Sequence, residues 1–230
     1  MKYKHVICAI FIERPNRFIA ICDINGEKVK AHVRNTGRCR ELLINGVKVY
    51  LEVSSGAKRK TGYTLIAVEK GDRLINIDSL APNKVVLEAL KTEKLQFPNF
   101  GKPTIIKPEK QFNDSRLDFY LETGNKKVFV EVKGVTLEKD NVALFPDAPT
   151  ERGVKHIKEL VNAVLEGYEA YIVFIVQMKG VSSFSPNIIT HPEFGYELKK
   201  AFKAGVNIIC LDCYTDIDCI SIGDPVPILI

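Results

Sequence analysis

The 230-residue sequence lacks tryptophan, has only two methionines, and contains no apolar run near the roughly 18 residues that a membrane-spanning helix needs. Its first apolar run, residues 6–12, stops at Glu13 and Arg14, and no small-residue cleavage site follows. We therefore expect neither a signal peptide nor a membrane span, and we expect a cytoplasmic protein. Apolar residues make up 46% of the chain, enough for a folded core, which excludes a largely disordered chain.

Several common catalytic patterns are also missing. The sequence has no P-loop, no dinucleotide-binding fingerprint and no recognisable Ser–His–Asp arrangement. The lack of tryptophan also disfavours RNA or single-strand binding by base stacking, since few aromatic residues beyond Tyr63 lie in the basic segments. We therefore rank single-strand or RNA binding below binding to duplex DNA, which requires positive charge but no base stacking.

Positive charge is concentrated in the first third of the chain. Residues 1–78 hold 15 Lys and Arg against 8 Asp and Glu, whereas the remainder has a slight negative excess. A basic domain of this kind is typical of proteins that bind a polyanion, although a solvated basic face without a partner has the same composition.

The six cysteines are expected to be reduced core residues, because the sequence has no export signal. Cys8 and Cys22 flank the turn at residues 14–17 symmetrically, so a hairpin in that register would place them opposite each other, either packed or as a disulfide. Three cysteines lie near the C-terminus: Cys210 and Cys213 form a C-x-x-C pattern, and Cys219 follows them. Strand positions three apart point to opposite faces, so zinc binding would need an early strand end and a fourth ligand such as His191. Zinc is not the expected outcome.

Short alternating runs in the first 80 residues predict antiparallel strands. They cover residues 5–13, 18–25, 28–33, 48–55 and 63–69. The pair Asn25-Gly26 between two of these runs is a strong hairpin signal. Short strands at this spacing favour a small β-barrel or sandwich.

The pattern changes near residue 80, where we place a boundary between domains 1–80 and 81–230. A helix capped by Asn83 is predicted over residues 84–95, followed by extended runs 103–109, 115–122 and 127–137. Then come a helix from Thr150 to a cap at Gly167, a buried strand 170–178, a helix 192–204 and a strand 206–213. The order αβββαβαβ predicts an α/β domain with a mixed sheet.

Two carboxylates and a lysine stand out in the second domain. Asp118 lies mid-strand, and Glu131 and Lys133 lie two residues apart on the next strand, so these two share one face. Their neighbours are mostly valines, and charges in such a setting are costly unless they pair or bind an ion. Mg²⁺ or Mn²⁺ suits two carboxylates, water and a phosphate, and it would activate water for phosphodiester hydrolysis, with Lys133 assisting. The alternative is a half-buried ion-pair network without metal.

Other residues are candidates for supporting roles. Glu88 on the preceding helix would add a third carboxylate, and Gln177 at the end of the buried strand would bind water or substrate. The free backbone N–H groups at the start of a helix favour phosphate binding. The start of the helix predicted from Thr150 carries Thr150, Arg152, Lys155 and His156, and His156 is expected only as a neighbour of the site. The candidate nucleic-acid contacts in the first domain are Arg34, Asn35, Arg38, Arg40, Lys58, Arg59 and Lys60.

Several strings resemble the sugar fermentation stimulation protein A family: AHVRNTGRCRELL, KRKTGYTL, SRLDFYLE, VEVKGVTL, FPDAPTERGVKHIKEL and VFIVQ. The resemblance implies an OB-like barrel, a restriction-endonuclease-like PD-(D/E)XK domain, and DNA binding with little sequence preference. It also implies that Asp118 and Glu131 bind metal, that Lys133 is the motif lysine, and that Glu88 and Gln177 contribute from helix and strand. Leu117 stands where the motif has proline.

Two functions follow from these observations. One is a metal-dependent deoxyribonuclease acting on DNA, with double-stranded DNA as the expected partner. The other is a non-cleaving DNA-binding regulator of sugar metabolism genes. The sequence leaves open whether the protein is a monomer or a homodimer.

Overall fold

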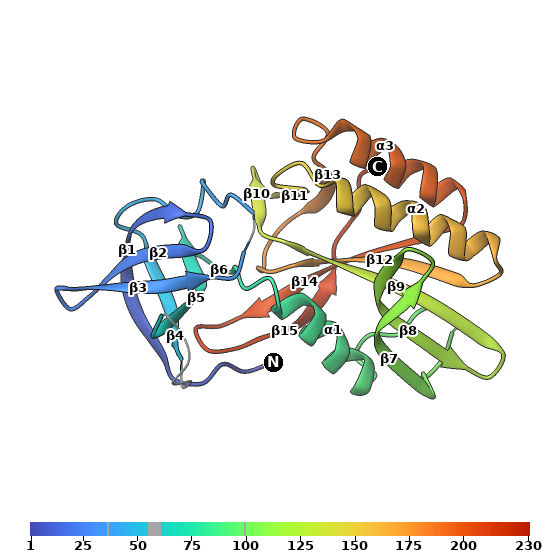
Figure 1. Cartoon of the computed structure of the whole chain (residues 1–230), viewed down its shortest axis with the longest axis horizontal. Helices are drawn as coiled ribbons and strands as arrows, with labels where there is room; N and C mark the ends of the chain where they lie inside the picture. Colours follow the sequence, from blue (N-terminus) through green and yellow to red (C-terminus); the bar gives the residue numbers. More distant parts are fainter. Residues whose placement is uncertain (36, 55–60, 99) are drawn as a thin grey trace.

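The computed structural model describes all residues except 36, 55–60 and 99, and the chain forms a barrel beside a larger α/β part (Figure 1). The barrel strands are β1 (Val6–Asn16), β2 (Ile19–Ile24), β3 (Glu27–Val33), β4 (Lys48–Val53) and β5 (Tyr63–Lys70). They pair in the order β3-β2-β1-β4-β5, and a parallel pairing of β3 with β5 closes the barrel. β6 (Arg73–Asn76) pairs with β5. The predicted OB-like barrel is confirmed.

The turn between β2 and β3 shows how the local sequence sets the register. Asn25 and Gly26 both have positive φ, 53° and 91°, as a two-residue hairpin turn requires. Ile24 of β2 and Glu27 of β3 consequently form the pair next to the turn, and the pairing continues to Ile19 with His32.

The expected position of Cys8 opposite Cys22 is wrong. β1 continues to Asn16, which pairs with Ile19, and two register shifts place Phe11 opposite Cys22. Cys8 instead pairs with Tyr50 on β4, and both cysteines are free. The physical reason is that the turn lies after Asn16, later than the Arg-Pro-Asn-Arg sequence suggested.

The second part is built on a six-stranded mixed sheet in the order β15-β14-β12-β9-β8-β7. The elements are α1 (Ala81–Lys91), β7 (Ile105–Phe112), β8 (Ser115–Thr123), β9 (Lys126–Val135), α2 (Glu151–Leu165), β12 (Glu169–Val176), α3 (Pro192–Lys203), β14 (Asn207–Thr215) and β15 (Ile220–Pro225). β9, β12 and β14 are parallel, whereas β7, β8 and β15 pair antiparallel with their neighbours. This is the predicted mixed-sheet α/β domain.

Besides β6 of the barrel, four strands of the second part had no counterpart in the sequence prediction. β10 (Leu137–Lys139), β11 (Val142–Phe145) and β13 (Ser183–Pro186) form a small separate sheet, and β15 is the edge of the main sheet. Three of them are only three or four residues long, too short for a clear alternation of polar and apolar residues.

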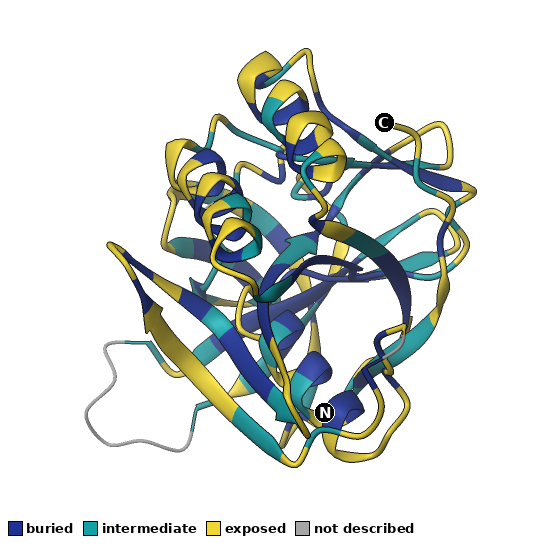
Figure 2. Ribbon diagram, turned by 90° about the vertical axis from the view of Figure 1, so that its right-hand side faces the viewer, coloured by how far each residue is buried: buried dark blue, intermediate teal, exposed yellow. Residues whose placement is uncertain are grey.

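The helices cover both faces of the main sheet (Figures 1 and 2). Val85 and Val86 of α1 belong to one apolar cluster with Val130 and Val173. On the opposite face, α2 packs against β12 and β9 through the second cluster, and α3 packs against α2. Apart from Glu169, every residue of β12 is buried, as its apolar sequence predicts. Among the residues that the structure describes, no helix is long and apolar enough to cross a membrane.

Candidate functional site

Asp118 lies where the pairing between β8 and β9 ends. The last pair of the ladder is Phe119 with Val130, and beyond it the backbone N–H of Val132 donates to Oδ2 of Asp118 at 2.8 Å. The side-chain amide of Asn83 in α1 donates to Oδ1 at 2.7 Å. The acid is therefore oriented by a strand on one side and by a helix on the other.

The carboxylate of Glu131 is almost completely buried, with 2% of the residue exposed. Its Oε1 accepts a hydrogen bond from Nζ of Lys133 at 2.5 Å and also contacts Nδ1 of His156 on α2. Within the described structure, Oε2 is buried and has no hydrogen-bond partner. An unpartnered buried carboxylate oxygen is costly, and a bound cation would remove that cost.

Burial and neighbouring charges shift the pKa values of the two acids in opposite directions. Burial raises the pKa of Asp118 to about 6, and the neighbouring negative charge of Glu131 adds to this effect. Burial also works to raise the pKa of Glu131, but the Lys133 ammonium and His156 outweigh it and hold that pKa below its ordinary value. Glu131 is thus ionised at neutral pH beside an acid that resists ionisation, a pattern typical of functional sites.

These donors fit a hard divalent cation. Mg²⁺ and Mn²⁺ are usually held by one or two carboxylates together with water and substrate oxygens. Asp118 and Glu131 supply the carboxylates, and the free Oε2 of Glu131 is the atom best suited to bind a metal ion. Hydrogen bonds bring together the three residues singled out in the sequence: Asp118 accepts the N–H of Val132, which lies between Glu131 and Lys133 on β9, and these two are bonded to each other at 2.5 Å.

Asn83 was expected only as a helix cap, and its contact with Asp118 was missed. α1 begins three residues earlier than predicted, at Ala81, with Pro82 in its first turn, where proline is favoured. Asn83 is therefore inside the helix and its side chain is free to reach Asp118. Pro82 in the first turn was the available signal for the earlier start.

Two residues that the sequence suggested for the metal and catalytic site, Glu88 and Gln177, bond to other groups. Glu88 is exposed, and its carboxylate pairs with the amino group of Met1 at 2.5 Å. Gln177 is buried and donates through Nε2 to Oδ1 of Asn76 at 2.8 Å and to the backbone oxygen of Asp78 at 3.1 Å. We therefore leave Glu88 out of the metal site, and we assign Gln177 to the contact between the barrel and the α/β part.

The start of α2 is organised around Thr150 and His156. Thr150 caps the helix by accepting the N–H of Gly153 at 3.1 Å. Nε2 of His156 accepts a hydrogen bond from Nε of Arg152 at 3.3 Å, and Lys155 donates to the backbone oxygen of Asp114 at 2.8 Å. Arg152 and Lys155 are exposed near the candidate metal site, whereas His156 is buried in contact with Glu131.

The barrel carries an arginine-lined groove of about 620 Å³. Its lining includes the predicted Arg38 and Arg40, both exposed, together with Arg17. The guanidinium of Arg14 shapes this loop by donating to the backbone oxygens of residues 17, 35, 37 and 38. These arginines form a positive concave surface suited to phosphate groups.

The other predicted contacts in the barrel differ in their surroundings. Arg34 is mostly buried and pairs with Asp78 at 2.9 Å and with Glu52 at 3.5 Å, so its charge is already neutralised. Asn35 stabilises the loop by accepting the N–H of Gly37 and donating to the backbone oxygen of Ile77. Lys58, Arg59 and Lys60 lie outside the residues that the structure describes.

A second cavity of about 400 Å³ lies between the barrel and the α/β part. Arg17 and Asn35 line one side of it, and Gly134, Thr150 and Gln177 line the other. The two cavities share Arg17, Gly37 and Ala148. One concave surface therefore runs from the barrel arginines to Gly134, the residue that follows Lys133.

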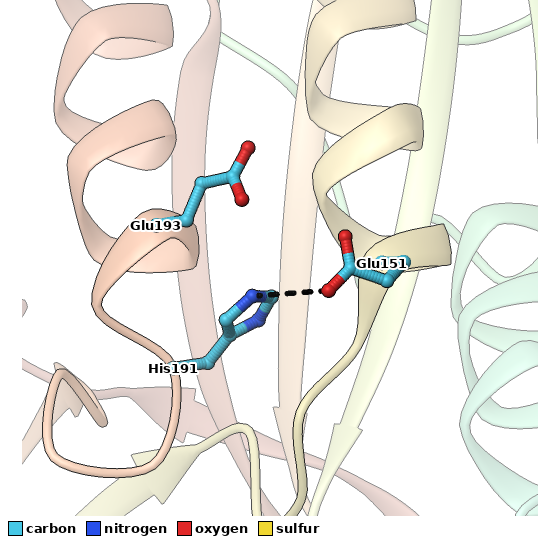
Figure 3. Close-up of side chains that lie close together, drawn as sticks. All are labelled: Glu151, His191 and Glu193. Atoms are coloured by element: carbon cyan, nitrogen blue, oxygen red, sulfur yellow. Dashed lines mark ion pairs between the residues drawn. The ribbon is translucent and has the colours of Figure 1, made fainter.

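A second group of possible ligands consists of Glu151, His191 and Glu193 at the starts of α2 and α3 (Figure 3). Nδ1 of His191 accepts the N–H of Thr150 at 3.3 Å, so the proton of the neutral ring sits on Nε2, which faces Glu151 at 3.7 Å. Glu193 also pairs with Lys158 at 3.2 Å. This arrangement suits helix-end ion pairs better than metal binding, because Nε2 has no free lone pair.

The possible zinc site near the C-terminus is not formed. His191 lies with the two glutamates of Figure 3 rather than with the cysteines. Cys210 and Cys213 are buried in β14, and burial raises the pKa of both thiols, that of Cys213 to about 12. Zinc binds thiolates, which such surroundings disfavour.

Comparisons with known proteins agree with this architecture. Residues 12–77 match the SfsA N-terminal OB domain, and residues 80–218 match the sugar fermentation stimulation protein RE domain. The chain is 55% identical to a sugar fermentation stimulation protein homolog of Ruminiclostridium cellulolyticum (94% of each chain). It is 52% identical to one of Clostridium beijerinckii (100% of each). The structure of Pyrococcus furiosus SfsA in complex with Ca²⁺ is similar with a TM-score of 0.91 at 32% identity, covering 100% of this chain and 98% of that one. The chain therefore belongs to the sugar fermentation stimulation protein family.

Proposed function

We propose that this protein binds DNA with little sequence preference and hydrolyses its phosphodiester bonds with a divalent cation at Asp118 and Glu131. The observation that carries the proposal is the buried, unpartnered Oε2 of an ionised Glu131 beside Asp118. The Ca²⁺ named for the Pyrococcus furiosus relative supports a cation site in this family. We infer Mg²⁺ or Mn²⁺ as the working ion because both accept the same oxygen ligands.

The side chains around the acids have distinct tasks in this proposal. A divalent cation would polarise the phosphodiester and lower the pKa of an attacking water molecule. Lys133 keeps Glu131 ionised and, with 13% of its side chain exposed, can donate to a phosphate oxygen as negative charge develops. Asn83 and the N–H of Val132 hold Asp118 in one orientation.

The concave surface between the domains supports DNA as the substrate. Arg17, Arg38 and Arg40 lie on the barrel side of it, and Gly134, next to Lys133, lies at the other end. In this proposal, DNA held by the arginines continues past Gly134 toward the two acids on β8 and β9. Contacts of this kind carry little sequence information, which agrees with binding of low specificity.

The direct test is incubation of supercoiled plasmid with the protein and Mg²⁺ or Mn²⁺. We expect nicking by wild type and its loss in Asp118→Asn and Glu131→Gln, with DNA binding retained by both variants in a gel-shift assay. The control variant is Lys203→Glu, an exposed substitution on α3 away from the acids. Equal cleavage by wild type and both acid variants would mean that the nuclease activity comes from another site or from a contaminant.

A second candidate function is a DNA-binding protein that does not cut, such as a regulator of sugar metabolism genes. The positive charge of residues 1–78 and the exposed arginines of the groove favour binding independently of the acids. Tight, salt-dependent binding without cleavage in any of Mg²⁺, Mn²⁺ or Ca²⁺ would support this function over the first.

A further inference from the structure

His156 is a polar residue on the apolar face of α2, and its position needs an explanation. The helix buries Val154, Ile157 and Leu160 on the same side, and only 5% of His156 is exposed. A buried imidazole is costly unless both ring nitrogens have partners. Both do, and the partners connect the candidate metal site to the protein surface.

The hydrogen bonds determine which nitrogen carries the proton. Nε of Arg152 donates to Nε2 of His156 at 3.3 Å, so Nε2 must present a lone pair. The proton of the neutral ring is then on Nδ1, which contacts Oε1 of Glu131. Arg152 is exposed in the first turn of α2, so a chain of contacts runs from the surface through the imidazole to the buried acid.

The consequence for Glu131 is an uneven use of its two oxygens. Lys133 and His156 both occupy Oε1, whereas Oε2 has no partner in the described structure. Lys133 is attached to the same strand two residues away, but His156 approaches from a different element. The imidazole therefore fixes the carboxylate relative to α2, which Lys133 does not do.

We propose that His156 is a positioning residue of the metal site: its Nδ1–H holds Oε1 of Glu131 so that Oε2 stays free to bind the cation, and Arg152 holds the ring in the required tautomer. The inference rests on the proposed function, since it concerns a cation at Asp118 and Glu131. Hydrogen-bond partners of metal ligands commonly contribute to metal affinity in this way.

The test is the Mn²⁺ affinity of the metal-free full-length protein, measured by calorimetry and by the electron paramagnetic resonance signal of free Mn²⁺. Loss of such a partner typically costs about 10- to 100-fold in metal affinity, and we expect that loss in His156→Leu. His156→Asn should remain close to wild type, because its Nδ2 takes the position of Nδ1. His156→Gln places its nitrogen nearer the position of Nε2 and should behave like the leucine variant. The asparagine and glutamine pair keeps the test decisive if His156→Leu fails to fold.

The matched control is Leu160→Ala, which creates a cavity under the same helix one turn beyond His156 and removes no hydrogen bond to Glu131. It should lower the melting temperature and leave Mn²⁺ affinity unchanged. A second readout is the separate measurement of kcat and KM. At a fixed Mn²⁺ concentration His156→Leu should lower kcat, while the KM for DNA stays the same.

The outcomes separate this inference from the proposed function. Mn²⁺ binding that Glu131→Gln abolishes but His156→Leu leaves intact would overturn the role of His156 alone. Equal losses in His156→Asn and His156→Gln, or an equal loss in Leu160→Ala, would show a general packing effect and would also overturn it. No Mn²⁺ binding by wild type would overturn both the inference and the proposed metal site.

Discussion

Asn83 donates its side-chain amide to Oδ1 of Asp118 at 2.7 Å, and this bond joins the first turn of α1 to the end of the β8–β9 ladder. The donor is neutral, as is the N–H of Val132 that holds the other oxygen. Both donors orient the carboxylate without supplying a full positive charge. Burial and Glu131 therefore still raise the pKa of Asp118 to about 6, and the metal-free protein carries an acid that is costly to ionise.

We expect Asp118→Asn to make the metal-free protein more stable at neutral pH. The folded-state pKa of Asp118 is about 6 against an ordinary value of 3.8, so the folded protein binds this proton more tightly than the unfolded chain does. The free energy of unfolding of the wild type should therefore fall as pH rises from about 4 through about 6, and the whole loss is present at about pH 7. The variant should gain up to about 3 kcal/mol at pH 7 and almost nothing at pH 4, measured by urea unfolding in a chelator.

The control for this pH dependence is Glu138→Gln. Although burial tends to raise the pKa of Glu138, Lys70 and its other partners hold it below its ordinary value. Its carboxylate thus stabilises the fold above its unfolded pKa, and the variant should be less stable than wild type at pH 7. Added Mn²⁺ should stabilise wild type and leave Asp118→Asn unaffected. A variant Asp118→Asn that is less stable than wild type at pH 7 would contradict the high pKa.

The order of the main elements could be predicted from the sequence because the relevant signals are local. The Asn25-Gly26 hairpin, the Thr150 cap and the fully apolar β12 each depend on a few neighbouring residues. The pairing of acids on β8 and β9 could also be anticipated, since alternate strand residues share a face. The small sheet of β10, β11 and β13 could not, because it joins segments some 40 residues apart through very short strands.

The partners of individual polar side chains were the least predictable feature. Asn83, Glu88 and Gln177 are all near the ends of elements, and a shift of three residues in a helix start changes what such a side chain reaches. The burial of Arg34 depends on Asp78 and Glu52, which are distant in sequence. Composition identifies a basic loop, but only tertiary structure separates an arginine paired inside the protein from one that faces solvent.

Arg34 is therefore expected to act in stability rather than in DNA binding. Arg34→Met would leave the fully buried Asp78 without its cation, and breaking such a pair typically costs about 3 kcal/mol. Urea unfolding at pH 7 measures this loss. Arg38→Met, at an exposed position of the same loop, is the matched control and should leave stability unchanged. Weaker DNA binding by Arg34→Met at full stability would show that Arg34 contacts DNA.

The groove arginines should account for part of the salt dependence of DNA binding. We expect the double charge reversal Arg38→Glu and Arg40→Glu to weaken binding equally for unrelated sequences. The slope of log affinity against log salt should fall by roughly 0.9 for each DNA phosphate that the variant no longer neutralises. The control is Lys200→Glu with Lys203→Glu on α3, which changes the net charge by the same amount at exposed positions. Equal weakening by both pairs would point to net charge rather than to the groove.

Gln177 offers a test of whether a buried polar group serves the domain contact or the chemistry. Gln177→Leu removes the donor to Asn76 and to the backbone of Asp78, and leaving these buried acceptors unpaired should cost about 1–3 kcal/mol of unfolding free energy. Gln96→Leu, at an exposed position, is the control and should cost little. Because the Gln177 side chain bonds across the domains and not to Asp118 or Glu131, Mn²⁺ affinity should persist in the folded variant. A variant with wild-type stability but without Mn²⁺ binding would instead place Gln177 in the metal site.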